Sequence, residues 1–304
     1  MLLVTGASGF LGANIALAAA DEGRRVVGVT HRRAFSAEGV KTVGVDLTAL
    51  EAVPNLLKDF KPDWVLNCAA LANVDQCERD TALARQLNVD LPAALARACA
   101  EHGARLLHVS TDSVFDGMRG AYTELDEPRP LNEYARTKRA GEAAVMTILP
   151  AALVLRTNFV GFSADGKTGL ADWITSRAFD RQTIPGFCDV TFAPLLVNEL
   201  AKTMLEMIDL ELSGLYHVGA GDSSTKHDFA RRLCAALGAD ADAVTPAFLA
   251  DAALHAPRPL NTSLSSAKAA EALGRPMPSV DEAIDGYAAL RRSGYPERLR
   301  ATMS

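Results

Sequence analysis

The chain of 304 residues is 49% hydrophobic and 22% charged, and its formal net charge is −6. This composition is typical of a folded globular protein and excludes a disordered chain. The chain is long enough to form one large domain, or two lobes, around a hydrophobic core. The negative charge argues against broad binding to nucleic acid or to an anionic membrane, although a few local arginines can still bind a small anion.

The chain starts with an apolar strand pattern rather than a signal peptide, and no apolar stretch is long enough to span a bilayer. Its five cysteines are dispersed, without the CxxC spacing of a zinc site. We therefore expect reduced thiols in a cytoplasmic protein without a metal site.

The first half of the chain alternates apolar strands with helical patterns. Strands are expected at 2–6, 25–30, 41–46, 63–70, 104–112 and 151–160, and helices at 10–21, 49–60 and 81–103, before the helix that carries Tyr134. Near-continuous apolar strands that alternate with helices predict an α/β fold, with a doubly wound parallel sheet covered on both faces.

The second half is less regular. A strand is expected at 214–221 and a helix at 224–238, with Thr225 as its N-cap. Proline-containing segments, of which 246–259 is the longest, are expected to form loops that wrap back over the first lobe.

A glycine-rich loop lies between the first expected strand and the first expected helix, in "VTGASGFLGANIA". Its G-x-x-G-x-x-G spacing differs from the commonest dinucleotide fingerprint, G-x-G-x-x-G, but the physics is shared. Glycines allow a tight turn and a close approach to a pyrophosphate, while the helix N-terminus offers free N–H groups. The predicted dinucleotide-binding residues of this loop are Gly6, Ser8, Gly9, Phe10, Leu11 and Gly12.

The residues after the second strand favour NADPH over NADH. An acidic residue at this place would bind the ribose diol of NAD, but the strand runs into "VTHRR". Arg32 and Arg33 can neutralise a 2′-phosphate through charge-assisted hydrogen bonds. The alternative is a pair of solvated surface arginines, so NADH stays open as the cofactor.

Further motifs follow the glycine loop in order: "VDL" at 45–47, "NCAA" at 67–70, "LNVD" at 87–90, "VSTDSVF" at 109–115 and Y-x-x-x-K at 134–138. Together they resemble the extended short-chain dehydrogenases/reductases. Within that family, "STDSVFDG", "GLYHVGAGDSS" and "RPLNTSLSS" resemble the dTDP-4-dehydrorhamnose reductase branch. The resemblance covers most of the chain and is strongest over the first 160 residues.

The resemblance implies catalytic roles for three residues. Tyr134 and Lys138 lie one helical turn apart on the same face, and the tyrosine would give its proton to a carbonyl oxygen while hydride arrives from the nicotinamide. The lysine would also bind the nicotinamide ribose, and its charge, together with the positive nicotinamide of the oxidised cofactor, would lower the tyrosine pKa from about 10. Thr111 would hydrogen-bond the same carbonyl oxygen.

The resemblance also implies further contacts with the cofactor. Asp46 and Leu47 would flank the adenine, and Ala69 and Ala70 would lie beside the cofactor. Asn88 matches an asparagine that orients the lysine region in the family, and a purely structural role is the open alternative.

Substrate-binding candidates follow the same strands. Asp112 and Ser113 come directly after Thr111, and Asn158 and Phe159 follow the strand that ends near the tyrosine. Arg258 is the candidate for a substrate diphosphate, with an ordinary loop arginine as the alternative. Sugar-nucleotide dehydratases of this superfamily carry glutamate where this chain has Ser113, so dehydration is disfavoured.

The expected function is NADPH-dependent reduction of a nucleoside-diphosphate 4-keto-6-deoxy sugar. The alternatives are a sugar-nucleotide epimerase, another carbonyl reductase, or a non-catalytic cofactor-binding subunit that resembles the regulatory subunit of methionine adenosyltransferase. We expect a Rossmann-type NAD(P)-binding domain at 1–160 and a smaller, mainly substrate-binding lobe at 161–304, with parts that return to the first domain. A homodimer is open.

Overall fold

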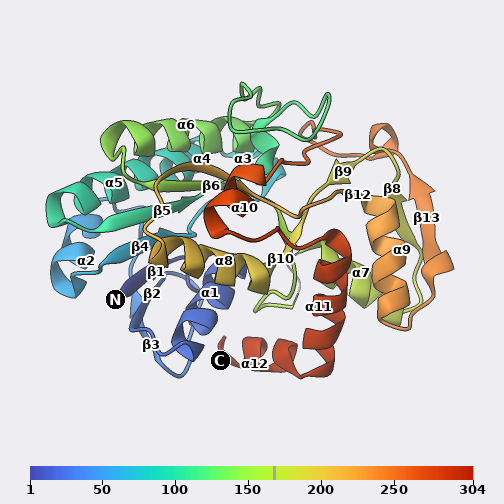
Figure 1. Ribbon diagram of the computed structural model, residues 1–304, viewed down its shortest axis with the longest axis horizontal. Coiled ribbons are helices and arrows are strands. Elements are labelled where there is room, and N and C mark those ends of the chain that lie inside the picture. The colour runs from blue at the N-terminus through green and yellow to red at the C-terminus, as the bar shows by residue number, and fades with distance from the viewer. Residues whose placement is uncertain (167–168, 304) are drawn as a thin grey trace.

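The computed structural model describes residues 1–166 and 169–303 and contains a seven-stranded, entirely parallel sheet (Figure 1). The strand order is β11-β6-β5-β4-β1-β2-β3, so the winding direction reverses between β1 and β4. The strands are β1 (Leu2–Thr5), β2 (Val26–Thr30), β3 (Val40–Gly44), β4 (Trp64–Asn67), β5 (Arg105–Val109), β6 (Leu153–Thr157) and β11 (Gly214–Val218). The predicted doubly wound fold is confirmed, and ligands bind such sheets where the order reverses, at the carboxyl ends of the strands.

Two hydrophobic cores cover the two faces of the sheet. The helices α2 (Ala52–Phe60), α5 (Leu91–His102) and α6 (Glu133–Ile148) pack on one face, and α1 (Phe10–Asp21) and α8 (Val197–Asp209) pack on the other (Figure 1). The central strands β1, β4 and β6 are buried along their whole length, as their apolar sequences predict. The edge strand β3 contains exposed residues.

The helix expected at 81–103 is present but contains a π-helical turn. The structure has α4 (Thr81–Arg85), a π-helical turn (Gln86–Asp90) and then α5, which ends before Gly103 in the left-handed conformation with φ 69°. Pro92 has no N–H to give the carbonyl of Asn88, four residues earlier, so the regular bonding pattern is interrupted there. The helix end at Gly103 is as predicted.

Several expected strands are shorter in the structure. β4 ends at Asn67 and β5 at Val109, because the chain turns there into loops at the carboxyl edge. The segment expected as one strand at 151–160 divides into β6 and the short β7 (Phe159–Val160), which pairs with β10 (Leu195–Leu196). These turns place polar residues at the edge of the sheet instead of inside it.

A smaller group of elements lies at one end of the molecule, at the right of Figure 1. It contains α7 (Leu170–Phe179), β8 (Ile184–Phe187), β9 (Thr191–Phe192), β12 (Ser224–Thr225), α9 (Lys226–Ala236) and β13 (Val244–Ala247). Thr225 caps α9, since its hydroxyl accepts a hydrogen bond of 3.0 Å from the Asp228 amide. The rest of the chain forms α10 (Ala267–Leu273), α11 (Val280–Arg292) and α12 (Tyr295–Ala301).

Later parts of the chain return to the first 160 residues, and two of these contacts are made with the sheet and with helices at its carboxyl edge. β11 extends the large sheet beside β6, and the segment 256–258 lies against α3 (Val74–Arg79) and the start of α6. There the amide of Ala256 donates to Asp75 at 3.1 Å, and Asn132 donates to the carbonyl of Pro257 at 2.9 Å.

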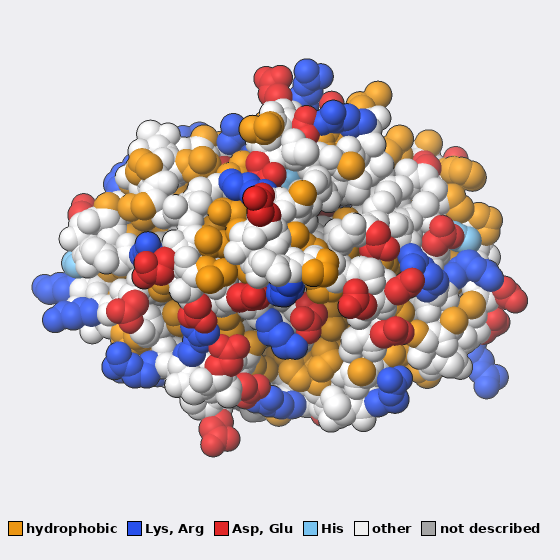
Figure 2. Space-filling view, in the orientation of Figure 1, with side chains coloured by type: hydrophobic (Ala, Val, Ile, Leu, Met, Phe, Trp, Pro, Cys, Tyr) orange, Lys and Arg blue, Asp and Glu red, His pale blue; other side chains and the backbone are white. Residues whose placement is uncertain are grey.

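The described part of the chain contains no helix with both the length and the apolar character needed to cross a membrane. On the face shown in Figure 2, acidic and basic side chains are interspersed rather than gathered into a patch of one sign.

Candidate active site

Two adjoining cavities lie at the carboxyl edge of the sheet. The first, which we call the catalytic cavity, has a volume of about 300 Å³, and the second, the nucleotide cavity, about 430 Å³. Five residues line both: Ser8, Gly9, Arg33, Cys68 and Ala70. An elongated ligand can therefore run from one cavity into the other past the glycine loop.

The glycine loop is shaped to receive a pyrophosphate. Gly6 has φ 65°, a left-handed conformation that favours glycine, and a Cβ there would lie 3.0 Å from the backbone of Ala69. A Cβ on Gly12 would lie only 2.0 Å from the carbonyl oxygen of Gly6, so α1 can approach the loop only with glycine at this position. Gly9 is the N-cap of α1 without a side-chain cap, which leaves backbone N–H groups free for an anion. These residues fit a dinucleotide.

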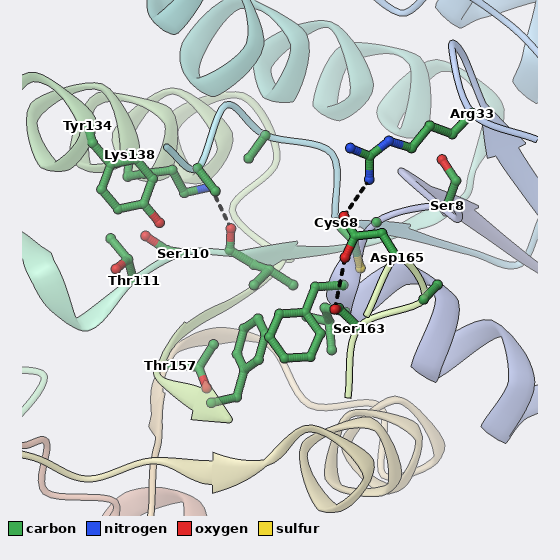
Figure 3. A pocket seen from close by; sticks show the side chains of 18 residues that line it. Ser8, Arg33, Cys68, Ser110, Thr111, Tyr134, Lys138, Thr157, Ser163 and Asp165 are labelled. Atoms are coloured by element: carbon green, nitrogen blue, oxygen red, sulfur yellow. Dashed lines mark hydrogen bonds and ion pairs between the residues drawn. The ribbon is translucent and has the colours of Figure 1, made fainter. Parts of the chain in front are cut away.

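The predicted catalytic residues come together around the catalytic cavity (Figure 3). Asn132 caps α6 by accepting a hydrogen bond of 2.9 Å from the Ala135 amide, and the helix then presents Tyr134 and Lys138 to the cavity. Thr111, two residues beyond the end of β5, lines the same cavity and lowers the pKa of Tyr134, while its hydroxyl donates to Asp112 at 3.2 Å. The Lys138 ammonium donates to the carbonyl of Val109 at 2.7 Å.

In the protein alone the pKa of Tyr134 shifts upward, whereas the lowering was expected from Lys138 together with the positive nicotinamide of an oxidised cofactor. Desolvation of the phenol in the cavity raises its pKa to about 12, and Thr111 opposes this rise only in part. Burial lowers the pKa of Lys138 to about 8, against the favourable charge of Glu142. At neutral pH the site therefore holds a protonated phenol beside an ammonium group, which is the state needed to give a proton to a carbonyl.

A buried ionic network supports the catalytic cavity from behind. The hydroxyl of Ser110, which lines the cavity, donates to Glu142 at 2.6 Å. Arg156 donates to the two oxygens of the same carboxylate at 2.9 and 2.7 Å, and Arg139 to one of them at 3.3 Å. Sequence analysis did not identify Ser110 or Glu142, although Glu142 lies one turn beyond Lys138 on α6.

Three of the substrate candidates form a cluster beside Thr111. Asp112 is buried, which raises its pKa, and it accepts hydrogen bonds of 2.6 Å from Asn158 and from Thr262. Ser113 donates to the same carboxylate at 3.2 Å. None of the three lines either cavity, and Asp112 and Ser113 position Thr111, because its hydroxyl donates to Asp112 and accepts from the Ser113 amide, both at 3.2 Å.

The other two substrate candidates are placed differently. Phe159 lines the catalytic cavity and packs edge to face against Phe10, with ring centroids 5.2 Å apart. Arg258 lines neither cavity; it forms an ion pair of 3.0 Å with Asp75 and donates to the carbonyl of Ala256. A substrate phosphate would have to compete with Asp75 for this arginine.

Lys226, the first residue of α9, is a cation near Asp112 and Arg258 that sequence analysis did not identify. Burial lowers its pKa, while the charge of Asp112 raises it and that of Arg258 lowers it further. The amine therefore lies in the electrostatic surroundings of the catalytic threonine.

The nucleotide cavity contains the residues expected around the adenosine. Arg32, Asp46 and Leu47 line it, and Ala69 and Ala70 form its wall beside the glycine loop. Backbone and side-chain hydrogen bonds from Thr48, at 2.9 and 2.6 Å, lower the pKa of Asp46. Asp46 is thus an acceptor already paired within the chain.

Arg33 has a carboxylate partner that the sequence does not place near it. It forms an exposed ion pair of 2.8 Å with Asp165, which comes from the segment after β7. Figure 3 shows this pair spanning the end of the catalytic cavity nearest Ser8. A 2′-phosphate would share Arg33 with Asp165, whereas Arg32 forms no ion pair with any described residue.

Asn88 lies outside both cavities. Its side chain accepts a hydrogen bond of 2.9 Å from the Leu71 amide and donates at 3.1 Å both to the Leu71 carbonyl and to Thr137. Thr137 lies on α6 between the catalytic tyrosine and lysine, so Asn88 connects the loop after β4 to the catalytic helix. These hydrogen bonds indicate a structural role for Asn88 rather than a direct contact with the cofactor.

Some lining residues were not expected. Those of the catalytic cavity are Cys68, Ala72, Val109, Ser110, Thr157, Ser163, Ala164 and Asp165. Cys68, Ser110 and Thr157 lie at or just beyond the carboxyl ends of β4, β5 and β6, and this position alone could have identified them. Among the described residues, no group of histidine, cysteine and acidic side chains is arranged to hold a metal ion.

Comparisons with known proteins agree with this geometry. The model of the family described as RmlD substrate binding domain matches residues 1–292. A probable low-salt glycan biosynthesis reductase of Haloferax volcanii is 36% identical, over 92% of this chain and 94% of that protein. The dTDP-4-dehydrorhamnose reductase of Mycobacterium tuberculosis is 35% identical, over 87% of this chain and 84% of that protein. A solved dTDP-4-dehydrorhamnose reductase of Bacillus anthracis, in complex with NADP, superposes with a TM-score of 0.84 at 24% identity, covering 94% of this chain and 97% of that one.

Proposed function

The chain belongs to the RmlD substrate-binding family, and we propose on this basis that it is an NADPH-dependent reductase of a nucleoside-diphosphate 4-keto-6-deoxy sugar. The observation that carries the proposal is the arrangement of Tyr134, Thr111 and Lys138 around one cavity that opens onto the glycine loop. Reduction of a ketone needs a proton donor at the carbonyl oxygen beside a bound hydride donor, and both places exist here.

The cofactor, when bound, supplies the hydride to the carbonyl carbon. Tyr134 gives its phenolic proton to the carbonyl oxygen, and Thr111 hydrogen-bonds that oxygen as negative charge develops. Lys138 stabilises the phenolate that remains after proton transfer, because its ammonium is buried one helical turn away. Solvent then returns a proton to Tyr134 before the next cycle.

Net reduction is favoured over the other reactions of this fold. Ser113, where the dehydratases carry glutamate, bonds to Asp112 and offers no acid for elimination of water. Residues 31–33 at the end of β2 contain no carboxylate for a tightly kept NAD, which disfavours an epimerase. A non-catalytic cofactor-binding subunit would not need the Tyr134 proton donor in its cavity.

The two parts of the chain would bind different ligands. Residues 1–160 would bind the cofactor through the loop at Gly6–Gly12 and the cation Arg32. Residues 161–304 would mainly hold the sugar nucleotide, with Lys226 and Arg258 as the candidate cations for its diphosphate. A cytoplasmic location and a homodimer are further parts of this proposal; sedimentation of the purified protein distinguishes one chain of 32.2 kDa from two.

The test follows NADPH absorbance with dTDP-4-keto-6-deoxyhexose and related keto-sugar nucleotides. Turnover is expected with at least one of them, and Tyr134→Phe should reduce it by about 10²- to 10⁴-fold while keeping NADPH affinity. The matched control is Tyr216→Phe, which removes the same hydroxyl from a residue of β11 outside both cavities and should leave turnover unchanged. Absence of NADPH and NADH oxidation with every keto-sugar nucleotide would contradict the proposal and favour a non-catalytic subunit.

A further inference from the structure

The hydroxyl of Thr157 has no role in the reaction described so far. Thr157 is the last residue of β6 and is 4% exposed, and its Oγ1 has no hydrogen-bond partner in the part of the chain that the structure describes. Buried hydroxyls are nearly always paired, because an unpaired one loses its hydrogen bonds to water without replacement. A partner from outside the chain is therefore needed.

This hydroxyl belongs to a residue that lines the catalytic cavity. β6 lies between β5 and β11, and Thr157 pairs in register with Val218, so its side chain stands at the carboxyl edge of the sheet. Figure 3 shows Tyr134 and Lys138 on one side of the cavity and Thr157 on the other. A ligand that reaches the catalytic tyrosine thus lies between it and Thr157.

Much of the cavity wall is apolar. Phe10 and Phe159, packed edge to face, line it together with Val109 and Ala164. The Ser110 hydroxyl in the cavity wall already donates a hydrogen bond to Glu142. A flat, largely apolar ring with a single polar substituent suits these surroundings better than a sugar, whose many hydroxyls would face apolar side chains.

We infer that Thr157 binds the carboxamide group of the nicotinamide ring. A carboxamide offers an N–H donor, and the threonine hydroxyl oxygen can accept its hydrogen bond. Such a bond would fix the rotation of the ring relative to Tyr134 and so select the face that meets the substrate carbonyl. The inference rests on the dinucleotide cofactor of the proposed function, but not on the identity of the sugar.

The experiment measures ligand binding by calorimetry in the absence of any sugar. Thr157→Val keeps the side-chain shape and removes the hydroxyl. It should weaken NADPH binding by about three- to tenfold. Binding of adenosine 2′,5′-bisphosphate, which lacks the nicotinamide, should be unchanged, and Thr157→Ser should restore NADPH binding.

A second comparison tests the carboxamide directly. The 3-acetylpyridine analogue of NADP has a methyl group in place of the amide nitrogen. Wild-type protein should bind NADP more tightly than this analogue, and the ratio of the two affinities should be smaller in Thr157→Val. The unfolding midpoint of ligand-free Thr157→Val in urea should be no lower than that of wild type, because valine removes an unpaired buried hydroxyl.

The inference is overturned if Thr157→Val binds NADPH as tightly as wild type, or if it weakens both NADPH and adenosine 2′,5′-bisphosphate equally. It is also overturned if only the KM for the sugar rises, since the hydroxyl would then serve the substrate. Because these binding measurements need no turnover, their failure and a failure of the proposed reductase activity are separate results.

Discussion

Glu142 and Arg156 form a two-point ion pair in which the carboxylate is fully buried and the guanidinium is 1% exposed. The pair connects three parts of the site: Glu142 lies on the catalytic helix, Arg156 lies on β6, and Ser110 binds the same carboxylate from the end of β5. A buried charge of this kind is expensive unless it is fully paired. The helix that carries Tyr134 is thereby held against the carboxyl edge of the sheet.

Replacement of Glu142 by glutamine should destabilise the protein strongly. Arg156 would keep its charge without its partner, which typically costs about 3–5 kcal/mol. Urea unfolding followed by circular dichroism measures this change. The control is Glu206→Gln, whose partner Arg275 is partly exposed and should lose only about 0–1 kcal/mol. Equal losses in the two variants would show that burial of the Glu142 pair does not determine its contribution.

The pH dependence of reduction should reflect Lys138. Burial lowers the pKa of this amine to about 8, so its charge is present below that pH and is lost as the pH rises through it. Loss of the ammonium disfavours the phenolate form of Tyr134, which must appear after proton transfer, so kcat should fall on the alkaline side with a midpoint near this value.

The same alkaline limb offers a second measurement. Glu142 raises the pKa of Lys138, so Glu142→Gln should move the limb to lower pH in the fraction of protein that remains folded. Glu206→Gln should leave it in place. An alkaline limb that does not move in Glu142→Gln would mean that the carboxylate has only a structural role.

The choice between NADPH and NADH should depend on the arginines after β2. Exchange of Arg32 and Arg33 for glutamine removes charge-assisted hydrogen bonds of about 1.5–3 kcal/mol to a 2′-phosphate. NADPH affinity should therefore fall tenfold or more, while NADH affinity changes little. Single variants separate the two: Arg32→Gln should have the larger effect, because Arg33 is already paired with Asp165. Equal losses for both cofactors would assign the arginines to another part of the ligand.

Gly12→Ala should abolish cofactor binding or prevent folding, although alanine is the better helix former. Its Cβ would lie 2.0 Å from the carbonyl oxygen of Gly6, so α1 would have to move away from the loop. Gly44→Ala is the control, because it lies at the exposed edge strand with open space around its Cβ position. Thermal unfolding with and without NADPH measures both variants, and normal NADPH stabilisation of Gly12→Ala would contradict the assigned packing role.

The local features of the site could be predicted because they depend on neighbours in the sequence. Glycines between a strand and a helix, and a tyrosine and lysine four residues apart, need only regular backbone geometry to take their positions. Thr111 could be placed for the same reason, directly after a buried strand. The structure brings these residues to one pair of adjoining cavities, as the motifs indicate.

The partners of the charged residues could not be predicted. Arg258 pairs with Asp75, Arg33 with Asp165, and Asp112 with Thr262. In two of these three pairs the partners are 150 or more residues apart in the sequence. Which carboxylate a cation meets depends on how the loops pack at the carboxyl edge, not on a local pattern. Desolvation is likewise a property of the folded cavity, which is why the upward shift of the Tyr134 pKa in the protein alone was not expected.

The sequence by itself determined the class of fold, because periodicity is fixed by the covalent chain. It also predicted a dinucleotide loop and catalytic roles for Tyr134, Lys138 and Thr111 from short spacings. Only the tertiary structure decided that Glu142 and Arg156 lock the catalytic helix to the sheet, that Asn88 binds Leu71, and that the Thr157 hydroxyl is left unpaired among the described residues. Burial and long-range pairing set the free energy of a polar group, and both arise when distant segments pack together.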